Sequence, residues 1–430
     1  MGERRRRRPA AGTRRERDLL GELEVPAQAL YGIHTVRSLN TLSFSGRKLG
    51  DYPVYVGALA MVKKAAARAN RDAAVLPARV ARAIEYACDA LIRGEHAEQF
   101  PVDMLGGGGE IAVNMNVNEV IANLANQLLG ERRADDPTVH PKTHVNASQS
   151  TSEVCHSAAR IALVQMWHGL ESALEACAAA LDTSSRDFAA VMTLARTCLR
   201  DAEATSLGEF FGGQAQAIRR RARELGHSIG SLRRINLGGT AIGSGRGAPT
   251  AYRARVVRHA REITGIALRT RANLYDAAQN LDDLGEVGAQ LGLLAEVLIK
   301  IAADLRLLSS GPDGGFGELT LPAVQEGSSF FPGKINPSVP ETILQCCFQV
   351  LGCERSARLA VERGELNLNI FGAAAVTNLF DMISMLQRAL VLLVERCLQG
   401  MTANTERCRA LATRVSAGQR FNRFDTGNQP

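Results

Sequence analysis

The chain of 430 residues is long enough to bury a large core, and its length favours two or three domains. Aromatic residues make up only 5% of it, and alanine and leucine are abundant, which favours packed helices over sandwiches or barrels. The net charge is +7, but residues 1–18 hold eight arginines against three acids. The other 412 residues are therefore close to neutral, and nucleic acid is disfavoured as a partner.

Residues 1–18 are predicted to form a disordered, Arg-rich tail. Contact with nucleic acid or an anionic surface is one interpretation, and a plain solvated extension is the favoured one. No apolar segment follows the arginines, so they do not form a secretory signal. No stretch of 18 apolar residues lacks charge, so no membrane span is expected. Nine cysteines without CxxC spacing indicate reduced thiols in a cytoplasmic protein.

Helical periodicity dominates the rest of the chain. Two or three helices are expected over 53–97, a break at the glycine run 106–109, and a further helix over 117–129. A polar loop covers 131–152. Long helices are then predicted over 153–182, 203–227, 250–279, 284–308, 338–363 and 367–397. Lengths of about 40 Å each are unusual in a globular body and predict an elongated all-α bundle.

One loop, residues 327–337, carries the strongest chemical signal. It reads Gly-Ser-Ser-Phe-Phe-Pro-Gly-Lys-Ile-Asn-Pro. Glycines let the backbone approach a ligand closely, and hydroxyl and backbone N–H groups can then point inward. Lys334 adds a point charge and Asn336 a directional donor. The loop is equipped to hold a carboxylate while a neighbouring C–H is deprotonated.

This residue string resembles the signature loop of the aspartase/fumarase superfamily, and Glu341 after it also matches. The likeness runs in family order over residues 19–415 and is closest to aspartate ammonia-lyases. It is carried by Leu20–Ala27, Tyr31–Arg37, Asn114–Glu119, His144–Asn146, Gln149–Thr151 and Asp304–Pro312.

The resemblance implies three mostly helical domains around a central long-helix bundle. The expected boundaries are a tail at 1–18, an N-terminal domain at 19–152, a bundle domain at 153–397 and a shortened C-terminal domain at 398–430. It also implies a homotetramer in which each active site draws on three subunits, and a cofactor-free, metal-free β-elimination that gives fumarate.

Site roles follow from the same resemblance. Ser328 would be the base, its oxyanion stabilised by loop N–H groups and Lys334. Stabilising the dianionic aci-carboxylate is the largest demand of such a reaction. The donors to that carboxylate would be Ser150, Thr151 and Ser329, and the second carboxylate would be held by Lys334, Asn336 and Thr197.

Three positions depart from the family pattern. Ile111 stands where relatives have threonine, Ser152 where they have asparagine, and Cys198 where they have histidine. The last two lie on the side of the departing amino group. The prediction is therefore a dicarboxylate lyase whose leaving group is larger or less basic than ammonium, such as a substituted amine or nitrite.

Alternatives remain open. The chain could be a catalytically impaired homologue with an assembly or regulatory role. Asn116 and Glu341 are further possible site residues, and Glu341 either binds a cationic leaving group or caps its helix. Cys198, with Arg196 and Arg200 near it in sequence, is either a reactive thiol or a filler of the lost histidine's space.

Two weaker patterns are set aside. His140 and His144 have metal-pair spacing but no acidic or Cys partners nearby. The glycine-rich segment 238–245 could hold a phosphate, but no strand is expected before it, which disfavours a dinucleotide site.

Overall fold

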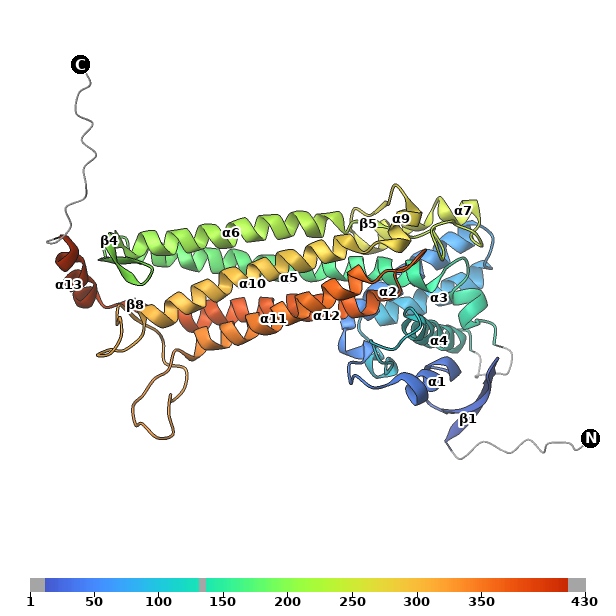
Figure 1. The fold of residues 1–430 in the computed structure, drawn as a ribbon. Helices are drawn as coiled ribbons and strands as arrows, with labels where there is room; N and C mark the ends of the chain where they lie inside the picture. Colours follow the sequence, from blue (N-terminus) through green and yellow to red (C-terminus); the bar gives the residue numbers. More distant parts are fainter. Residues whose placement is uncertain (1–11, 131–136, 417–430) are drawn as a thin grey trace, which may run out of the picture. The chain divides into compact units, whose positions relative to one another are not determined.

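The computed structural model describes residues 12–130 and 137–416, and this part is mostly helical (Figure 1). The predicted all-α class is confirmed. The chain divides into two compact units, each assembled from three separate segments. The first unit comprises Met1–His168, His227–Ala289 and Cys353–Met382, and the second Gly169–Gly226, Gln290–Gly352 and Ile383–Pro430. Every boundary between these units falls inside a helix.

The first unit is built around α2 (Pro53–Asp72), which packs against α3 (Ala78–Ile92) and α8 (Val256–Thr264). Proline at the first position of α2 has the backbone angle a helix needs there. Ala58, Ala65 and Ala69 on α2 are fully buried, and such small side chains let neighbouring helices approach closely. The unit's other elements are α1 (Ile33–Leu42), η1 (Leu49–Asp51), η2 (Ala97–Gln99), α4 (Ile111–Leu128), η3 (Pro141–Val145), α7 (Thr250–Arg253) and α9 (Leu274–Gln279).

The predicted disordered tail is wrong for its last six residues. β1 (Thr13–Asp18) pairs with β2 (Gly21–Pro26) in an antiparallel ribbon. The Arg14 guanidinium donates to Ala29 O at 2.9 Å and Tyr31 O at 2.7 Å, so its charge is used to anchor this ribbon. Residues 1–11 of the predicted tail lie outside the described residues.

The prediction of a single helix over 250–279 is also wrong. It is divided into α7, α8 and α9, with the two-residue strand β6 (Arg269–Thr270) between the last two. Gly265 ends α8 at a φ of 70°, which favours glycine. Asn273 then starts α9, its side chain accepting the N–H groups of Tyr275 and Asp276.

The second unit consists of the remaining parts of the long helices and short ribbons. Within it, Ser185 Oγ of α5 (Thr151–Asp187) donates to Gly208 O of α6 (Leu207–Ser231) at 2.7 Å. Arg306 of α10 (Asp282–Leu308) pairs with Glu341 of α11 (Ser338–Glu362) at 3.5 Å. The long helices, which run through both units, are α5 (Thr151–Asp187), α6 (Leu207–Ser231), α10 (Asp282–Leu308), α11 (Ser338–Glu362) and α12 (Gly372–Leu393). The unit's other elements are β3 (Met192–Thr197), β4 (Arg200–Ser206), β7 (Leu319–Thr320), β8 (Thr402–Ala403), η4 (Val394–Leu398) and α13 (Thr405–Ser416).

One described helix passes a length and hydropathy test for crossing a membrane. It is the stretch Gly372–Leu398, which comprises α12 and η4. However, 61% of its most apolar window is buried inside the protein, as in a core helix of a soluble protein.

Candidate active site

The 327–337 loop lies in the second unit, between β7 and α11. The Gly327 N–H donates to Lys334 O at 2.8 Å, and Asn336 Nδ2 donates to Gly327 O at 2.7 Å. A Cβ on Gly327 would lie 2.5 Å from Lys334 O, so only glycine fits there. The loop is thus closed at its base by its own hydrogen bonds, and Asn336 provides one of them.

Ser328 is held where backbone dipoles converge on its oxygen. Its Oγ accepts the N–H of Phe330 at 3.0 Å and the N–H of Phe331 at 2.9 Å. Serine turns in general make such bonds. Here they also place two donors on an oxygen that would carry negative charge if the hydroxyl lost its proton.

The rest of the loop faces solvent in this chain. Ser329 and Lys334 are exposed, and Lys334 Nζ lies 6.0 Å from the centre of the Phe331 ring. Phe330 and Phe331 are 80% and 59% exposed and meet edge to face at 4.9 Å. Two aromatic rings left in water at the tip of a loop are expected to be covered when a ligand or another chain contacts the loop.

Glu341 occupies the first turn of α11, where a carboxylate is favoured by the helix dipole. It also pairs with the Arg306 guanidinium at 3.5 Å. Glu341 thus stands at the start of α11 with its carboxylate paired to a cation of α10.

Thr197 and Cys198 lie at the tip of the β3–β4 hairpin. Thr197 pairs with Arg200 across a two-residue turn, and Cys198 and Leu199 both have positive φ, 51° and 57°. Left-handed angles at both positions match the twist of a hairpin but are costly for residues other than glycine. The turn holds the Cys198 thiol exposed to solvent. All nine cysteines are free.

Arg196, expected beside the thiol, is engaged elsewhere. Its guanidinium contacts Glu318 Oε1 at 2.6 Å and stacks 4.2 Å from the centre of the Phe316 ring. Glu318 is fully buried and also accepts the Thr193 hydroxyl. Sequence reasoning did not find this carboxylate, because its partners lie more than 120 residues away along the chain.

The serine and threonine side chains at the start of α5 lie together in the first unit. Ser150 Oγ and Ser152 Oγ are 3.0 Å apart, and Ser152 Oγ donates to Ala241 O at 3.2 Å. The Thr151 hydroxyl accepts Asn114 Nδ2 at 3.0 Å. Ser150 and Thr151 remain half-buried, whereas Ser152 is buried.

Glu153 organises this region and was missed as a site residue. Its carboxylate accepts the N–H groups of Ser150 at 3.0 Å, Gly238 at 2.6 Å and Thr240 at 3.1 Å. Burial raises its pKa from 4.5 to about 7. Because Glu153 takes two N–H groups of the 238–245 segment, they are not available to a phosphate. A two-residue strand, β5 (Arg234–Ile235), does precede that segment, contrary to expectation.

An amide network lies next to Thr151, since Asn114 Nδ2 contacts both the Thr151 hydroxyl and Asn146 Oδ1. Asn146 Oδ1 accepts Lys63 Nζ at 2.8 Å, Asn114 Nδ2 at 3.1 Å and Asn118 Nδ2 at 3.2 Å. Lys63 is fully buried, which lowers its pKa from 10.5 to about 7. Asn116, a possible site residue, is not part of this network, since its Nδ2 donates to Gln99 O at 2.9 Å.

Ile111 is the first residue of α4 and is 46% exposed. Before it, Glu110 has a φ of 66° and is buried beside Tyr55 and His156. Burial raises the pKa of Glu110 from 4.5 to about 7 and lowers that of His156 from 6.5 to about 3. The uncharged forms of both groups are thus favoured next to the exposed Ile111.

The two histidines with metal-pair spacing make local contacts. His144 Nδ1 accepts the His140 N–H at 2.9 Å, and His140 Nδ1 accepts the N–H groups of Lys142 and Thr143. In the described ranges 12–130 and 137–416, no group of three His, Cys, Asp or Glu side chains is placed to hold a metal ion.

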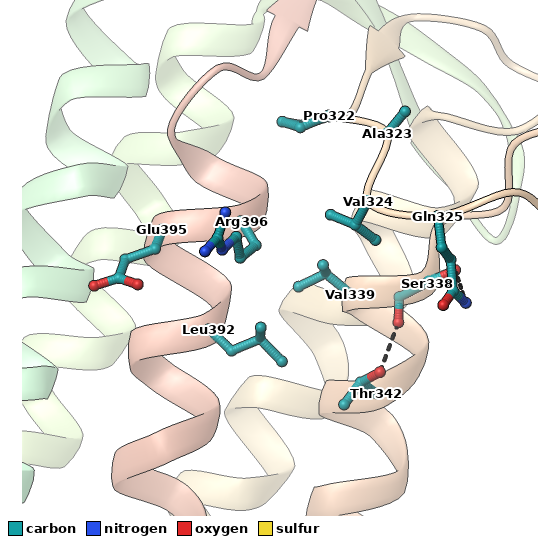
Figure 2. A pocket seen from close by; sticks show the side chains of 10 residues that line it. All are labelled: Pro322, Ala323, Val324, Gln325, Ser338, Val339, Thr342, Leu392, Glu395 and Arg396. Carbon is teal, nitrogen blue, oxygen red and sulfur yellow. Dashed lines mark hydrogen bonds between the residues drawn. The ribbon is translucent and has the colours of Figure 1, made fainter.

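A cavity of about 500 Å³ lies beside the chain that enters and leaves the 327–337 loop, within the second unit (Figure 2). Gln325 Nε2 donates to Ser338 Oγ at 3.3 Å. This bond joins the segment between β7 and the 327–337 loop to the start of α11. Arg396 and Glu395 bring opposite charges to the wall formed by η4. The remaining lining residues are Pro322, Ala323, Val324, Val339, Thr342 and Leu392.

Comparison with known proteins identifies the family of the chain. A family model described as lyase matches residues 21–352. The aspartate ammonia-lyase of Pseudomonas aeruginosa is 42% identical over 94% of this chain and 85% of its own length. That of Escherichia coli K12 is 37% identical over 91% and 82%.

Solved structures agree as well. Fumarate lyase:delta crystallin from Brucella melitensis superposes with a TM-score of 0.91 at 44% identity, covering 93% of this chain and 86% of that one. A class II fumarase from Schistosoma mansoni gives 0.90 at 26% identity, covering 93% and 87%. With the motif order, the fold and these relatives in agreement, the chain belongs to the lyase family of the aspartase/fumarase superfamily and is an enzyme of the lyase class.

Proposed function

We propose that this chain is a cofactor-free C–N lyase that expels a substituent from a succinate-type dicarboxylate and releases fumarate, with Ser328 as the base. One observation carries the proposal: the backbone N–H groups of Phe330 and Phe331 donate hydrogen bonds to Ser328 Oγ at 3.0 and 2.9 Å. Such donors stabilise the oxyanion a serine needs in order to accept a proton. The aspartate ammonia-lyase activity named for two relatives supports the C–N class.

In the first step the Ser328 alkoxide removes a proton from C3 of the substrate. The electron pair moves onto the adjacent carboxylate, which becomes a dianionic aci-carboxylate held by Ser150, Thr151 and Ser329. In the second step the pair returns to form the C2–C3 double bond while the C2–N bond breaks. The nitrogen leaves with the bonding electrons, and fumarate remains.

The second carboxylate is held by Lys334, Asn336 and Thr197. The Asn336 amide already donates one N–H to Gly327 O, and its second N–H is left for the substrate. Lys334 is exposed and has no carboxylate partner in the described part of the chain, so its charge is available to the ligand.

The leaving group is proposed to be larger or less basic than ammonium. Cys198 at the exposed hairpin tip offers no imidazole to protonate or bind a departing amine. Ser152 is short and engaged with Ser150 and Ala241 O, so it does not reach out as asparagine would. A substituted amine or nitrite fits this side of the site.

The assembly proposed is a cytoplasmic homotetramer whose active sites combine residues of three subunits. Support comes from the aromatic rings left exposed on the 327–337 loop and from the nine free cysteines, which suit a reducing compartment.

The test is a substrate panel with the full-length protein. Aspartate, N-substituted aspartates including argininosuccinate, nitrosuccinate and malate are each incubated, and fumarate is followed by ultraviolet absorbance. The expected result is faster fumarate release from an N-substituted aspartate or from nitrosuccinate than from aspartate or malate. No turnover of any of them, together with no addition of amines to fumarate, would instead identify a catalytically impaired homologue with an assembly or regulatory role.

A further inference from the structure

A second cavity lies in the first unit, where α6 ends and β5 begins. Its volume is about 420 Å³. Three arginines line it, Arg233, Arg234 and Arg269, and no acidic residue does. The other lining residues are His227, Gly230, Ser231 and Ala267. This arginine cavity shares no residue with the candidate active site.

The backbone forces two of these arginines together. Arg234 of β5 and Arg269 of β6 are register partners in a parallel pair, and the Arg269 N–H donates to Arg233 O at 2.8 Å. Neighbouring strands lie about 4.8 Å apart, and register partners point to the same face. Like charges placed opposite each other destabilise a sheet. An anion between them would remove this repulsion.

In the part of the chain that the structure describes, no carboxylate lies between them in this way. Arg233, Arg234 and Arg269 are all exposed, and none of them is paired there with an acid. Other arginines nearby are paired, since Arg258 contacts Glu262 at 3.6 Å and Arg271 contacts Asp283 at 3.7 Å. The arginine cavity therefore holds charges that the fold leaves uncompensated.

The sequence around the arginine cavity is unusually basic. Residues 233–271 contain nine arginines and one acid, Glu262. This segment therefore carries more positive charge than the +7 of the whole chain. A concave site inside such a field concentrates small anions from solution.

We infer that the arginine cavity binds a small molecule that carries a phosphate group, such as a phosphate monoester or a nucleotide. Guanidinium forks match phosphate oxygens two at a time, and three of them suit a group of two or more negative charges. The volume is that of a small-molecule pocket. The inference stands apart from the lyase reaction, because the arginine cavity and the candidate active site have no residue in common.

The experiment measures binding of inorganic pyrophosphate and of ATP to the full-length protein by titration calorimetry in low salt. Citrate and a 20-nucleotide single strand are the comparison ligands. The test variant is Arg234→Gln/Arg269→Gln. The matched control is Arg261→Gln, which removes an exposed arginine of the same basic segment that does not line the cavity. Circular dichroism checks that both variants are folded.

The expected result is one phosphate ligand per chain, bound about tenfold more weakly for each cavity arginine removed and unchanged in Arg261→Gln. Several results would overturn the inference: no binding of pyrophosphate or ATP, equal loss in the control, or no loss in the double variant. Citrate binding as tightly as pyrophosphate would remove the preference for phosphate. Binding of the oligonucleotide alone would make the site a nucleic-acid contact.

Discussion

Glu110 Oε2 lies 3.8 Å from His156 Nε2, and each side chain is only 3% exposed. Gly372 completes the enclosure, because a Cβ at that position would lie 3.1 Å from both atoms. Two titratable groups are thus enclosed beside the first turn of α4, and each is driven by burial toward its uncharged form.

This enclosure predicts a pH-dependent stability. Burial raises the pKa of Glu110 from 4.5 to about 7, so the folded protein keeps a proton that the unfolded chain releases between these values. The contribution of Glu110 to the free energy of unfolding is therefore complete below about pH 4.5 and is lost as the pH rises to about 7. In urea unfolding, the unmodified protein should lose about 2–3 kcal/mol more stability between pH 5 and pH 7.5 than Glu110→Gln, which has no group to titrate at this position.

His156 acts in the opposite direction. Its pKa falls from 6.5 to about 3, so its contribution to stability is lost as the pH falls below 6.5. Because both proteins carry His156, subtracting one pH profile from the other isolates Glu110. Parallel profiles for the two proteins would contradict the assignment.

Ser328→Ala is predicted to lower kcat by about 10²–10⁴ by removing the base. The fold should be unaffected, since the loop stays closed through Gly327 and Asn336. Ser329→Ala is the matched control, one residue away in the same loop. It should act mainly on the aci-carboxylate and leave measurable turnover. Fumarate release by Ser328→Ala at the rate of the unmodified protein would remove Ser328 as the base.

Cys198→His is predicted to shift the preference toward aspartate. An imidazole can bind or protonate an ammonia-sized leaving group, and histidine tolerates the left-handed backbone of this turn. We expect the ratio of kcat/KM for aspartate to that for an N-substituted aspartate to rise by about tenfold. Cys198→Ala, which supplies no ring, is the control and should leave the ratio unchanged. An equal rise in both variants would show that only the loss of sulfur matters.

Gly243 and Gly247 offer a matched pair for stability. Both have left-handed φ, 91° and 84°. A Cβ on Gly243 would lie 2.3 Å from the backbone of Leu274, whereas one on Gly247 would meet nothing within 4 Å. Gly247→Ala should cost only the backbone strain, about 1–2 kcal/mol. Gly243→Ala should cost at least about 2 kcal/mol more, because the backbone near α9 must move. Thermal unfolding of both variants measures the difference.

The long helices and the 327–337 loop were predictable because their signals are local. Apolar periodicity in α5, α10 and α12 persists over many turns, and the loop's residues are contiguous. The roles of Glu153 and Glu318 were not predictable, since each is defined by partners about 85 to 125 residues away. The 250–279 stretch has helical periodicity throughout, but Gly265 and the cap at Asn273 override it. The tail prediction failed at Arg14 because its guanidinium pairs with Glu16 at 2.8 Å and donates to the carbonyl oxygens of Ala29 and Tyr31.

The two hydrogen bonds that join Gly327 to Lys334 and Asn336 have a consequence for ligand capture. Fixing a free backbone costs about 1–2 kcal/mol per residue in conformational entropy. For a loop of this length, that cost would weaken ligand binding considerably. Because the loop is already tied at its base in the folded protein, part of this ordering is completed during folding. The substrate then has less of it to supply.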